Sequence, residues 1–311
     1  MALEPEQKIL SEFAEGYRKS INLEYLARKR CINRKNKNIM DVPHPFLKWA
    51  GGKRQLLKQF DSHFPDNYKN YIEPFVGGGT VFFYLLPEHT ILIDKNEELI
   101  NCYKVIQNHI EEIIQSLKQY RNEKDFFYTI RDADRNAIEF NKWTDIERAS
   151  RTIYLNRCCY NGLYRVNSKG QFNVPFGKYK NPRFCDEENL RAVNYALKNV
   201  KIYHDNFEKC LDFAGKDDFI YLDPPYQPLS STANFTSYTK EGFSENEQLK
   251  LLEVIKVLDK CGCKVMLSNS YNEFILNMYN EFNIITVNAK RAINSNAAKR
   301  GQIKEALIIN Y

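Results

Sequence analysis

A short Asp-Pro-Pro-Tyr segment has groups that could activate an amine. Asp223, Pro224, Pro225 and Tyr226 follow the apolar run Phe219–Leu222, so we expect them at the carboxyl end of a strand, where open α/β sheets hold ligands. A nucleobase amine is a poor nucleophile because its lone pair is delocalised into the ring. Asp223 and the Pro224 carbonyl could accept its two hydrogens, while Tyr226 offers a ring on which an extruded base could stack. Alone, the segment also fits a rigid turn.

A glycine-rich segment, EPFVGGGT at residues 73–80, leaves a predicted strand and enters a predicted helix. Its glycines permit a sharp turn and a close approach of a ligand to the backbone. The spacing departs from both the P-loop and G-x-G-x-x-G, so phosphate binding is poorly supported. Asp94 ends the next predicted strand, where a carboxylate can accept both hydroxyls of a ribose. Together these features favour a nucleoside-bearing cofactor without a pyrophosphate; the alternative is a structural turn beside a solvated carboxylate.

The elements that must position these residues form an α/β pattern. From residue 46 we expect a strand at 71–73, a helix from Thr80 and a strand at 90–93, the start of a doubly wound sheet. Residues 96–197 are mainly helical in pattern, with a capping box at Thr144 and Glu147 before a helix that reaches about Cys158. A second capping box, at Ser244 and Glu247, begins another helix. The further predicted strands are 200–203, 219–222, 264–267, 283–287 and 306–309.

Composition narrows the class of protein. The 311 residues are 43% hydrophobic and 27% charged, which suits one large α/β domain, with or without a smaller one, and excludes disorder, collagen and coiled coil. The longest apolar run, around Val81–Leu86, is too short to cross a bilayer, and residues 1–10 do not resemble a signal peptide. We therefore expect a soluble cytoplasmic protein with no membrane partner.

Charge and cysteine usage indicate the kind of partner and the absence of a metal. The net charge is +6, and two segments, 25–38 and 157–183, each hold six bases and no acid, which suggests a polyanionic partner. For residues 25–38 alone, a solvated helix face is the preferred interpretation. The eight cysteines form no C-x-x-C pair and the five histidines are scattered, so we expect neither disulfides nor a metal site.

Four segments resemble, in identity and order, the motifs of amino-methylating DNA methyltransferases, specifically the Dam type (D12 class) that modifies adenine N6. They are FLKWAGGK at 46–53, EPFVGGG at 73–79, HDNF at 204–207 and DPPY at 223–226. The resemblance covers about residue 46 to the C-terminus and implies a Rossmann-like doubly wound methyltransferase sheet with an inserted helical target-recognition domain, in the motif order of the alpha group. The implied domains are an N-terminal appendage (1–42), a catalytic domain (43–109 and 196–311) and a target-recognition domain (110–195).

The resemblance also implies site residues. S-adenosyl-L-methionine is the implied cofactor, and Asp223, Pro224, Pro225 and Tyr226 are the implied catalytic residues. The implied cofactor-binding residues are Trp49, Lys53, Glu73, Phe75, Gly77, Gly79, Asp94, Asp205 and Asn206.

The segments NGLYR (161–165) and FNVPFG (172–177) are similar to the recognition hairpin of Dam enzymes that act on GATC. By resemblance, Tyr160 wedges into the duplex, Lys48 contacts the first guanine, and three residues of the hairpin read the outer bases. Arg165 suits bidentate donation to guanine O6 and N7. An ordered surface loop is the alternative. Residues 157–160 and Tyr164 depart from the family's usual sequence. The implied DNA-binding residues are Lys48, Tyr160, Asn161, Leu163, Arg165 and Pro175.

The function that we expect is methyl transfer to adenine N6 of GATC in double-stranded DNA, by direct in-line attack on a flipped base. Cytosine C5 methylation is disfavoured because the chain has no Pro-Cys pair. Methylation of cytosine N4, RNA or protein glutamine stays open, as does a non-catalytic DNA-binding protein. The resemblance also suggests an association with the nucleoid and a possible cognate restriction endonuclease acting on the same site.

Overall fold

The computed structural model describes residues 42–226, 243–290 and 302–311. Residues His44–Tyr311 form one compact unit. Residues 1–41 of the predicted N-terminal appendage, including the basic segment 25–38, lie outside the described residues. Across the part of the chain that is described, no helix combines the length and the apolar character that a membrane crossing would need.

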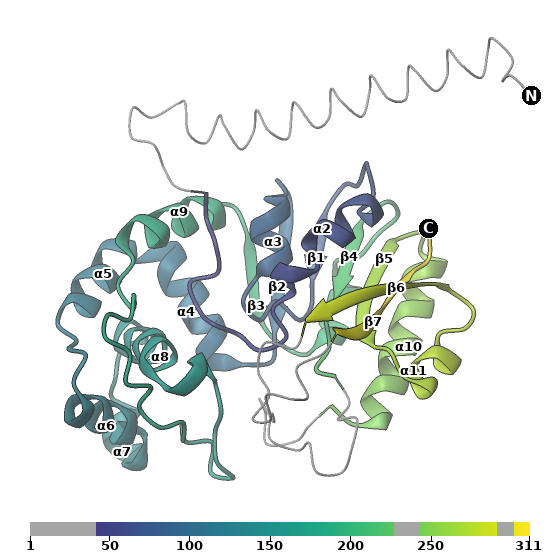
Figure 1. The fold of residues 1–311 in the computed structure, drawn as a ribbon. Coiled ribbons are helices and arrows are strands. Elements are labelled where there is room, and N and C mark those ends of the chain that lie inside the picture. Colours follow the sequence, from purple (N-terminus) through teal and green to yellow (C-terminus); the bar gives the residue numbers. More distant parts are fainter. Residues whose placement is uncertain (1–41, 227–242, 291–301) are drawn as a thin grey trace, which may run out of the picture. The chain divides into compact units, whose positions relative to one another are not determined.

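A mixed seven-stranded sheet occupies the centre of this unit (Figure 1), in the order β3-β2-β1-β4-β5-β7-β6. The first five strands along the chain pair in parallel, whereas β7 runs antiparallel between β5 and β6. The predicted strands are confirmed to within a few residues. Their bounds are β1 Tyr71–Glu73, β2 Thr90–Asp94, β3 Lys201–His204, β4 Phe219–Leu222, β5 Lys264–Ser270, β6 Asn283–Lys290 and β7 Gln302–Ile309.

Alternate residues of the parallel strands enter two separate cores, because successive strand residues point to opposite faces. Tyr71, Phe219 and Tyr221 pack on one face, and Ile72 and Ile220 pack on the other. The first face is covered by α2 (Leu57–Phe60), α3 (Thr80–Leu85) and α4 (Glu97–Asn108), and the second by α10 (Glu245–Lys260) and α11 (Glu273–Met278). Both faces of the sheet are therefore buried, as a doubly wound fold requires.

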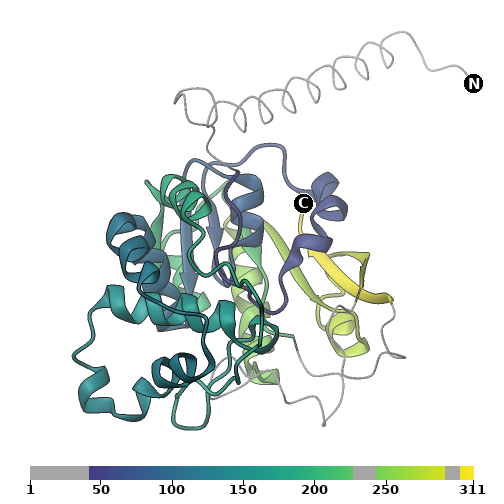
Figure 2. The same cartoon turned by 60° about the vertical axis from the view of Figure 1, so that its left-hand side comes forward.

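The predicted helical region forms a layer beside the sheet (Figure 1; Figure 2 has this side turned forward). Its central helix, α8, packs against α4, α5 and α6. The predicted capping box is confirmed: Thr144 N–H donates to Glu147 Oε2 at 2.7 Å, and Glu147 N–H donates to Thr144 Oγ1 at 3.2 Å. The helices of the region after α4 are α5 Ile110–Lys118, α6 Lys124–Asp132, α7 Ala137–Phe140, α8 Asp145–Cys158 and α9 Glu187–Leu197.

Short 3₁₀ helices connect several of these elements. The described ones are η1 Lys53–Gln55, η2 Asp61–His63, η3 Ala133–Arg135, η4 Tyr160–Gly162 and η5 Phe207–Asp212. The second predicted capping box is also confirmed, because Ser244 N–H donates to Glu247 Oε2 at 2.9 Å and begins α10.

The segment after α8 folds back on itself as a hairpin. Val166 bridges Phe172 and Cys159 bridges Phe176, both antiparallel. A turn lies at the tip, where Gly170 has φ +79°. The predicted division into a catalytic and a target-recognition domain, with boundaries at 110 and 195, stays a prediction.

Candidate active site

The carboxyl ends of four parallel strands meet at one edge of the sheet. Glu73 ends β1, Asp94 ends β2, His204 ends β3, and Asp223 directly follows β4. Strands β1 and β4 are neighbours, and the chain continues from β1 toward one side and from β4 toward the other. In open α/β sheets, ligands bind next to such a reversal of strand order. The sequence-predicted catalytic and cofactor segments are therefore brought to the same edge.

The Asp223 carboxylate is held through one of its oxygens. Lys53 Nζ lies 2.8 Å from Oδ1, and Ser268 Oγ donates to the same oxygen at 2.9 Å. Ser268 is in turn 3.2 Å from the Tyr221 hydroxyl. Burial raises the pKa of the Asp223 carboxyl, and the Lys53 ammonium opposes that rise. Both of these contacts, within the described ranges, use Oδ1 and not Oδ2.

Tyr226 lies against the same ion pair. Lys53 Nζ is 4.7 Å from the centroid of the Tyr226 ring and also donates to the Gly51 carbonyl at 2.7 Å. The Tyr226 hydroxyl donates to Glu305 Oε2 at 2.6 Å. Lys53, which we predicted to bind the cofactor, therefore contacts the residues of the Asp-Pro-Pro-Tyr turn directly. Glu305 was not predicted as a site residue, because a carboxylate that follows Lys304 in a strand carries no local sign of a role in the site.

Ser268 was not predicted either. It is fully buried in β5, between Leu267 and Asn269, and a serine in a buried strand carries no local sign of the residue that it binds. Of the two prolines, Pro224 is buried and Pro225 is exposed. The buried proline fixes the backbone at the point where the chain leaves β4.

The glycine-rich turn has a backbone that larger residues would strain. Gly77 and Gly79 have φ of +47° and +67°, and a Cβ on Gly77 would lie 2.8 Å from Trp49 Cδ1. Gly77 N–H donates to Asp94 Oδ2 at 3.0 Å, and Asn96 N–H donates to Oδ1 at 2.9 Å. The two backbone donors orient the Asp94 carboxylate at the mouth of the turn, and burial raises its pKa.

The other predicted cofactor residues lie around this turn, with one exception. The rings of Phe75 and Phe207 stack with centroids 5.3 Å apart. Asp205 N–H donates to the Asp94 carbonyl at 3.2 Å, and the Asn206 side chain caps η5. Glu73, by contrast, is directed into the interior, where it accepts the Tyr71 hydroxyl at 2.7 Å. Burial raises the pKa of Glu73 well above its usual value.

The predicted DNA-reading hairpin is ordered by its own hydrogen bonds. Arg165 Nε donates to Asn173 Oδ1 at 2.7 Å and Nη2 donates to the Asn173 carbonyl at 3.4 Å. Tyr160 is 56% exposed, and its N–H donates to the Pro175 carbonyl at 2.8 Å. Asn161 adopts φ +56°, and Leu163 is half-buried at the same turn. An exposed tyrosine ring and a planar cation thus lie on one loop.

A buried amide connects the hairpin to the segment that carries Lys53. Asn156 of α8 accepts from Lys48 N–H at 2.8 Å, donates to the Lys48 carbonyl at 2.8 Å, and donates to the Gly162 carbonyl at 3.1 Å. Next to this bridge, the rings of Trp49 and Tyr164 stack with centroids 5.1 Å apart. Lys48 and Trp49 therefore pack against the hairpin, while Trp49 also packs against the glycine-rich turn.

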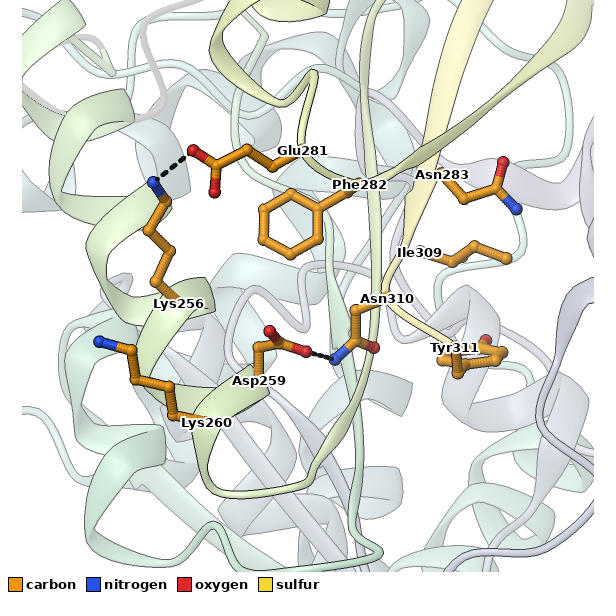
Figure 3. A pocket seen from close by; sticks show the side chains of 9 residues that line it. All are labelled: Lys256, Asp259, Lys260, Glu281, Phe282, Asn283, Ile309, Asn310 and Tyr311. Atoms are coloured by element: carbon orange, nitrogen blue, oxygen red, sulfur yellow. Dashed lines mark hydrogen bonds and ion pairs between the residues drawn. The ribbon is translucent and has the colours of Figure 1, made fainter.

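A separate hollow of about 350 Å³ lies at the opposite edge of the sheet, where β5 and β6 begin (Figure 3). Its polar groups pair with one another: Lys256 contacts Glu281 at 3.0 Å, and Asn310 donates to Asp259 at 2.6 Å. None of the predicted site residues lines it. The predicted catalytic and cofactor segments lie at the carboxyl edge instead.

The parallel sheet with an antiparallel β7, together with the turn after β4, defines a Rossmann-like methyltransferase. Residues 49–293 match the family model of the D12 class N6 adenine-specific DNA methyltransferases, and the chain belongs to this family. It is an adenine-specific DNA methyltransferase. This result disfavours the alternatives that the sequence left open, namely methylation of cytosine N4, RNA or protein glutamine, and a non-catalytic DNA-binding protein.

Curated relatives agree with this family. The chain is 47% identical to the type II methyltransferase M.MjaIII of Methanocaldococcus jannaschii, over 86% of this chain and 99% of that protein. It is 43% identical to the type II methyltransferase M1.LlaDCHI of Lactococcus lactis subsp. cremoris, over 90% and 99%. It is 37% identical to the DNA adenine methylase of Haemophilus influenzae, over 85% and 93%.

Proposed function

We propose that this enzyme transfers a methyl group from S-adenosyl-L-methionine to N6 of the adenine in GATC, in double-stranded DNA. The target base is flipped out of the duplex, and its amine attacks the methyl group in line. One observation supports the proposed activation of the amine: Lys53 and Ser268 both bind Oδ1 of Asp223. The second oxygen of the carboxylate, with the Pro224 carbonyl, is therefore available to accept the hydrogens of the amine.

The residues present fit the proposed cofactor. The glycine-rich turn brings backbone close to a ligand, and Asp94, with each oxygen already oriented by a backbone N–H, can accept ribose hydroxyls through its remaining lone pairs. Phe75 supplies an apolar ring beside the turn, and Asp205 and Asn206 border it. When bound, S-adenosyl-L-methionine would supply an electrophilic methyl group on a sulfonium.

The protein's own contribution is orientation and polarisation. Asp223 Oδ2 and the Pro224 carbonyl accept the two amine hydrogens, which concentrates the nitrogen lone pair toward the methyl donor. Tyr226 provides a face for stacking of the base. Because both acceptors are fixed before the base arrives, alignment lowers the barrier without a covalent intermediate.

Recognition of GATC is supported by the hairpin and its resemblance to Dam enzymes. Asn173 holds Arg165 through Nε and Nη2, which orients the planar guanidinium for bidentate donation to guanine O6 and N7. Tyr160 is exposed next to it, as a residue that wedges into the duplex must be. The alpha-group motif order and the roles of Lys48, Leu163 and Pro175 belong to the same proposal.

Label transfer tests the proposal. The purified chain is given methyl-labelled S-adenosyl-L-methionine and two duplexes of equal composition, one with GATC and one with the same four bases in the order GACT. We expect label only with GATC, at adenine N6 after digestion to nucleosides. Equal labelling of both duplexes would refute the GATC assignment but not adenine methylation. Label on cytosine would refute the proposed target.

A cognate restriction endonuclease and association with the nucleoid remain part of the proposal. Two similar relatives are named type II methyltransferases, which supports the first. Plasmid DNA from cells that express this enzyme should resist an endonuclease that cuts only unmethylated GATC. Complete cleavage of plasmid purified from cells that contain active enzyme would contradict methylation of GATC.

A further inference from the structure

The hydroxyl of Tyr226 is held by a residue from a distant part of the chain. It donates to Glu305 Oε2 at 2.6 Å, and Glu305 lies in β7, opposite Ser270 of β5 and Val287 of β6. The bond joins the catalytic turn to the antiparallel part of the sheet. Its length suits a hydroxyl that donates to a carboxylate rather than to a neutral oxygen.

The Tyr226 ring is fixed at two points, its hydroxyl by Glu305 and its face by Lys53, whose Nζ lies 4.7 Å from the ring centroid. Burial raises the pKa of Tyr226 well above its usual value, and Asp223 and Glu305 raise it further, so the phenol stays a neutral donor. Burial also raises the pKa of Glu305, against the opposing charge of Lys53. The ring therefore has one defined orientation before a base enters.

We propose that Glu305 is a positioning residue for methyl transfer: it accepts the Tyr226 hydroxyl and fixes the plane of the ring on which the target adenine stacks. This role rests on the proposed assignment of Asp223–Tyr226 as the catalytic turn. Glu305 does not touch the base and exchanges no proton with it. A tilted ring misaligns the amine and the methyl donor, and alignment acts on the rate of the chemical step.

The test uses the full chain and a duplex that the wild type methylates. Glu305→Leu, Glu305→Gln, Tyr226→Phe and the Glu305→Leu/Tyr226→Phe double variant are compared by single-turnover rate and DNA Kd. We expect Glu305→Leu and Tyr226→Phe each to slow the step by about tenfold, the effect of one hydrogen bond to a charged group. The double variant should be no slower than the slower single variant, because both changes remove the same bond. Glu305→Gln keeps an acceptor oxygen and should recover most of the rate, with DNA affinity unchanged throughout.

A matched control is Glu281→Leu, which removes an exposed carboxylate paired with Lys256 and should leave the rate unchanged. The role of Glu305 is overturned if Glu305→Leu is as fast as wild type, or if the two single losses multiply in the double variant. Should Glu305→Leu fail to fold, Tyr226→Phe removes the same bond from its other partner, and an undiminished rate there overturns the role too. Full activity of Asp223→Ala would instead refute the catalytic assignment itself.

Discussion

Replacement of Asn156 by alanine should loosen the connection between the backbone of Lys48 and the predicted DNA-reading hairpin. Asn156 is completely buried, and its amide makes three hydrogen bonds to the backbone of Lys48 and Gly162. Each such bond contributes about 1 kcal/mol net, so Asn156→Ala should lower the free energy of unfolding by about 3 kcal/mol. Because Lys48 then moves relative to Gly162, the enzyme should also discriminate less between GATC and a site with one outer base pair changed.

Asn189→Ala is a matched control for this change. Asn189 of α9 is also buried; it accepts from His44 N–H at 3.0 Å and donates to the His44 carbonyl at 3.0 Å. By the same reasoning, its loss should lower the free energy of unfolding by about 2 kcal/mol. Neither of these bonds of Asn189 involves the hairpin, so discrimination between GATC and the altered site should not change.

Two measurements check the pair. Urea unfolding followed by circular dichroism gives the free energies of unfolding, and the ratio of methylation rates on the two duplexes gives discrimination. A cost below about 1 kcal/mol for Asn156→Ala would refute the bond count as the source of stability. An equal loss of discrimination in Asn189→Ala would refute the specific connection to the hairpin.

Asp223→Ala should lower the methylation rate at least about 100-fold, the effect of removing one fixed polar group, with DNA affinity nearly intact; an equal loss of affinity, measured by fluorescence anisotropy, would contradict its role. Glu73→Gln should flatten the dependence of stability on pH. The folded pKa of Glu73 is raised by burial, so the folded state binds more protons than the unfolded chain, and the free energy of unfolding of the wild type should fall as pH rises above the ordinary glutamate value. Unfolding curves at several pH values check this, and identical slopes in both proteins would oppose it. Binding of duplex DNA should weaken steeply with salt if, as we expect, lysines and arginines in residues 157–183 contact phosphates; an affinity indifferent to salt in the same anisotropy assay would exclude that segment as the DNA face.

Local patterns predicted the elements and the motifs well. Phe219–Leu222 is buried on both faces in a parallel strand, which is why it appears in the sequence as a continuous apolar run. The capping boxes at Thr144 and Ser244 depend on residues only three positions apart, so a short stretch of sequence is enough to predict them.

Contacts across long separations could not be predicted in this way. Asp223 pairs with Lys53 and accepts a hydrogen bond from Ser268, and Tyr226 donates to Glu305. These contacts form only because the sheet brings their elements together. Asn156 gave no sign of its role either, since a polar residue in a helix is usually exposed. The placement of β7 between β5 and β6 also depends on tertiary pairing, which periodicity within one strand does not determine.

The inner position of β7 affects how the chain can fold during synthesis. Among the described strands, residues 302–309 are made last, yet both neighbouring strands pair with them. Until they pair, one edge of β5 is open and β6 has no partner strand in the sheet, and such unpaired backbone groups can pair with other chains. A chain in which β7 has not yet paired should therefore associate with other chains through these strands, and it needs protection from them until β7 is in place.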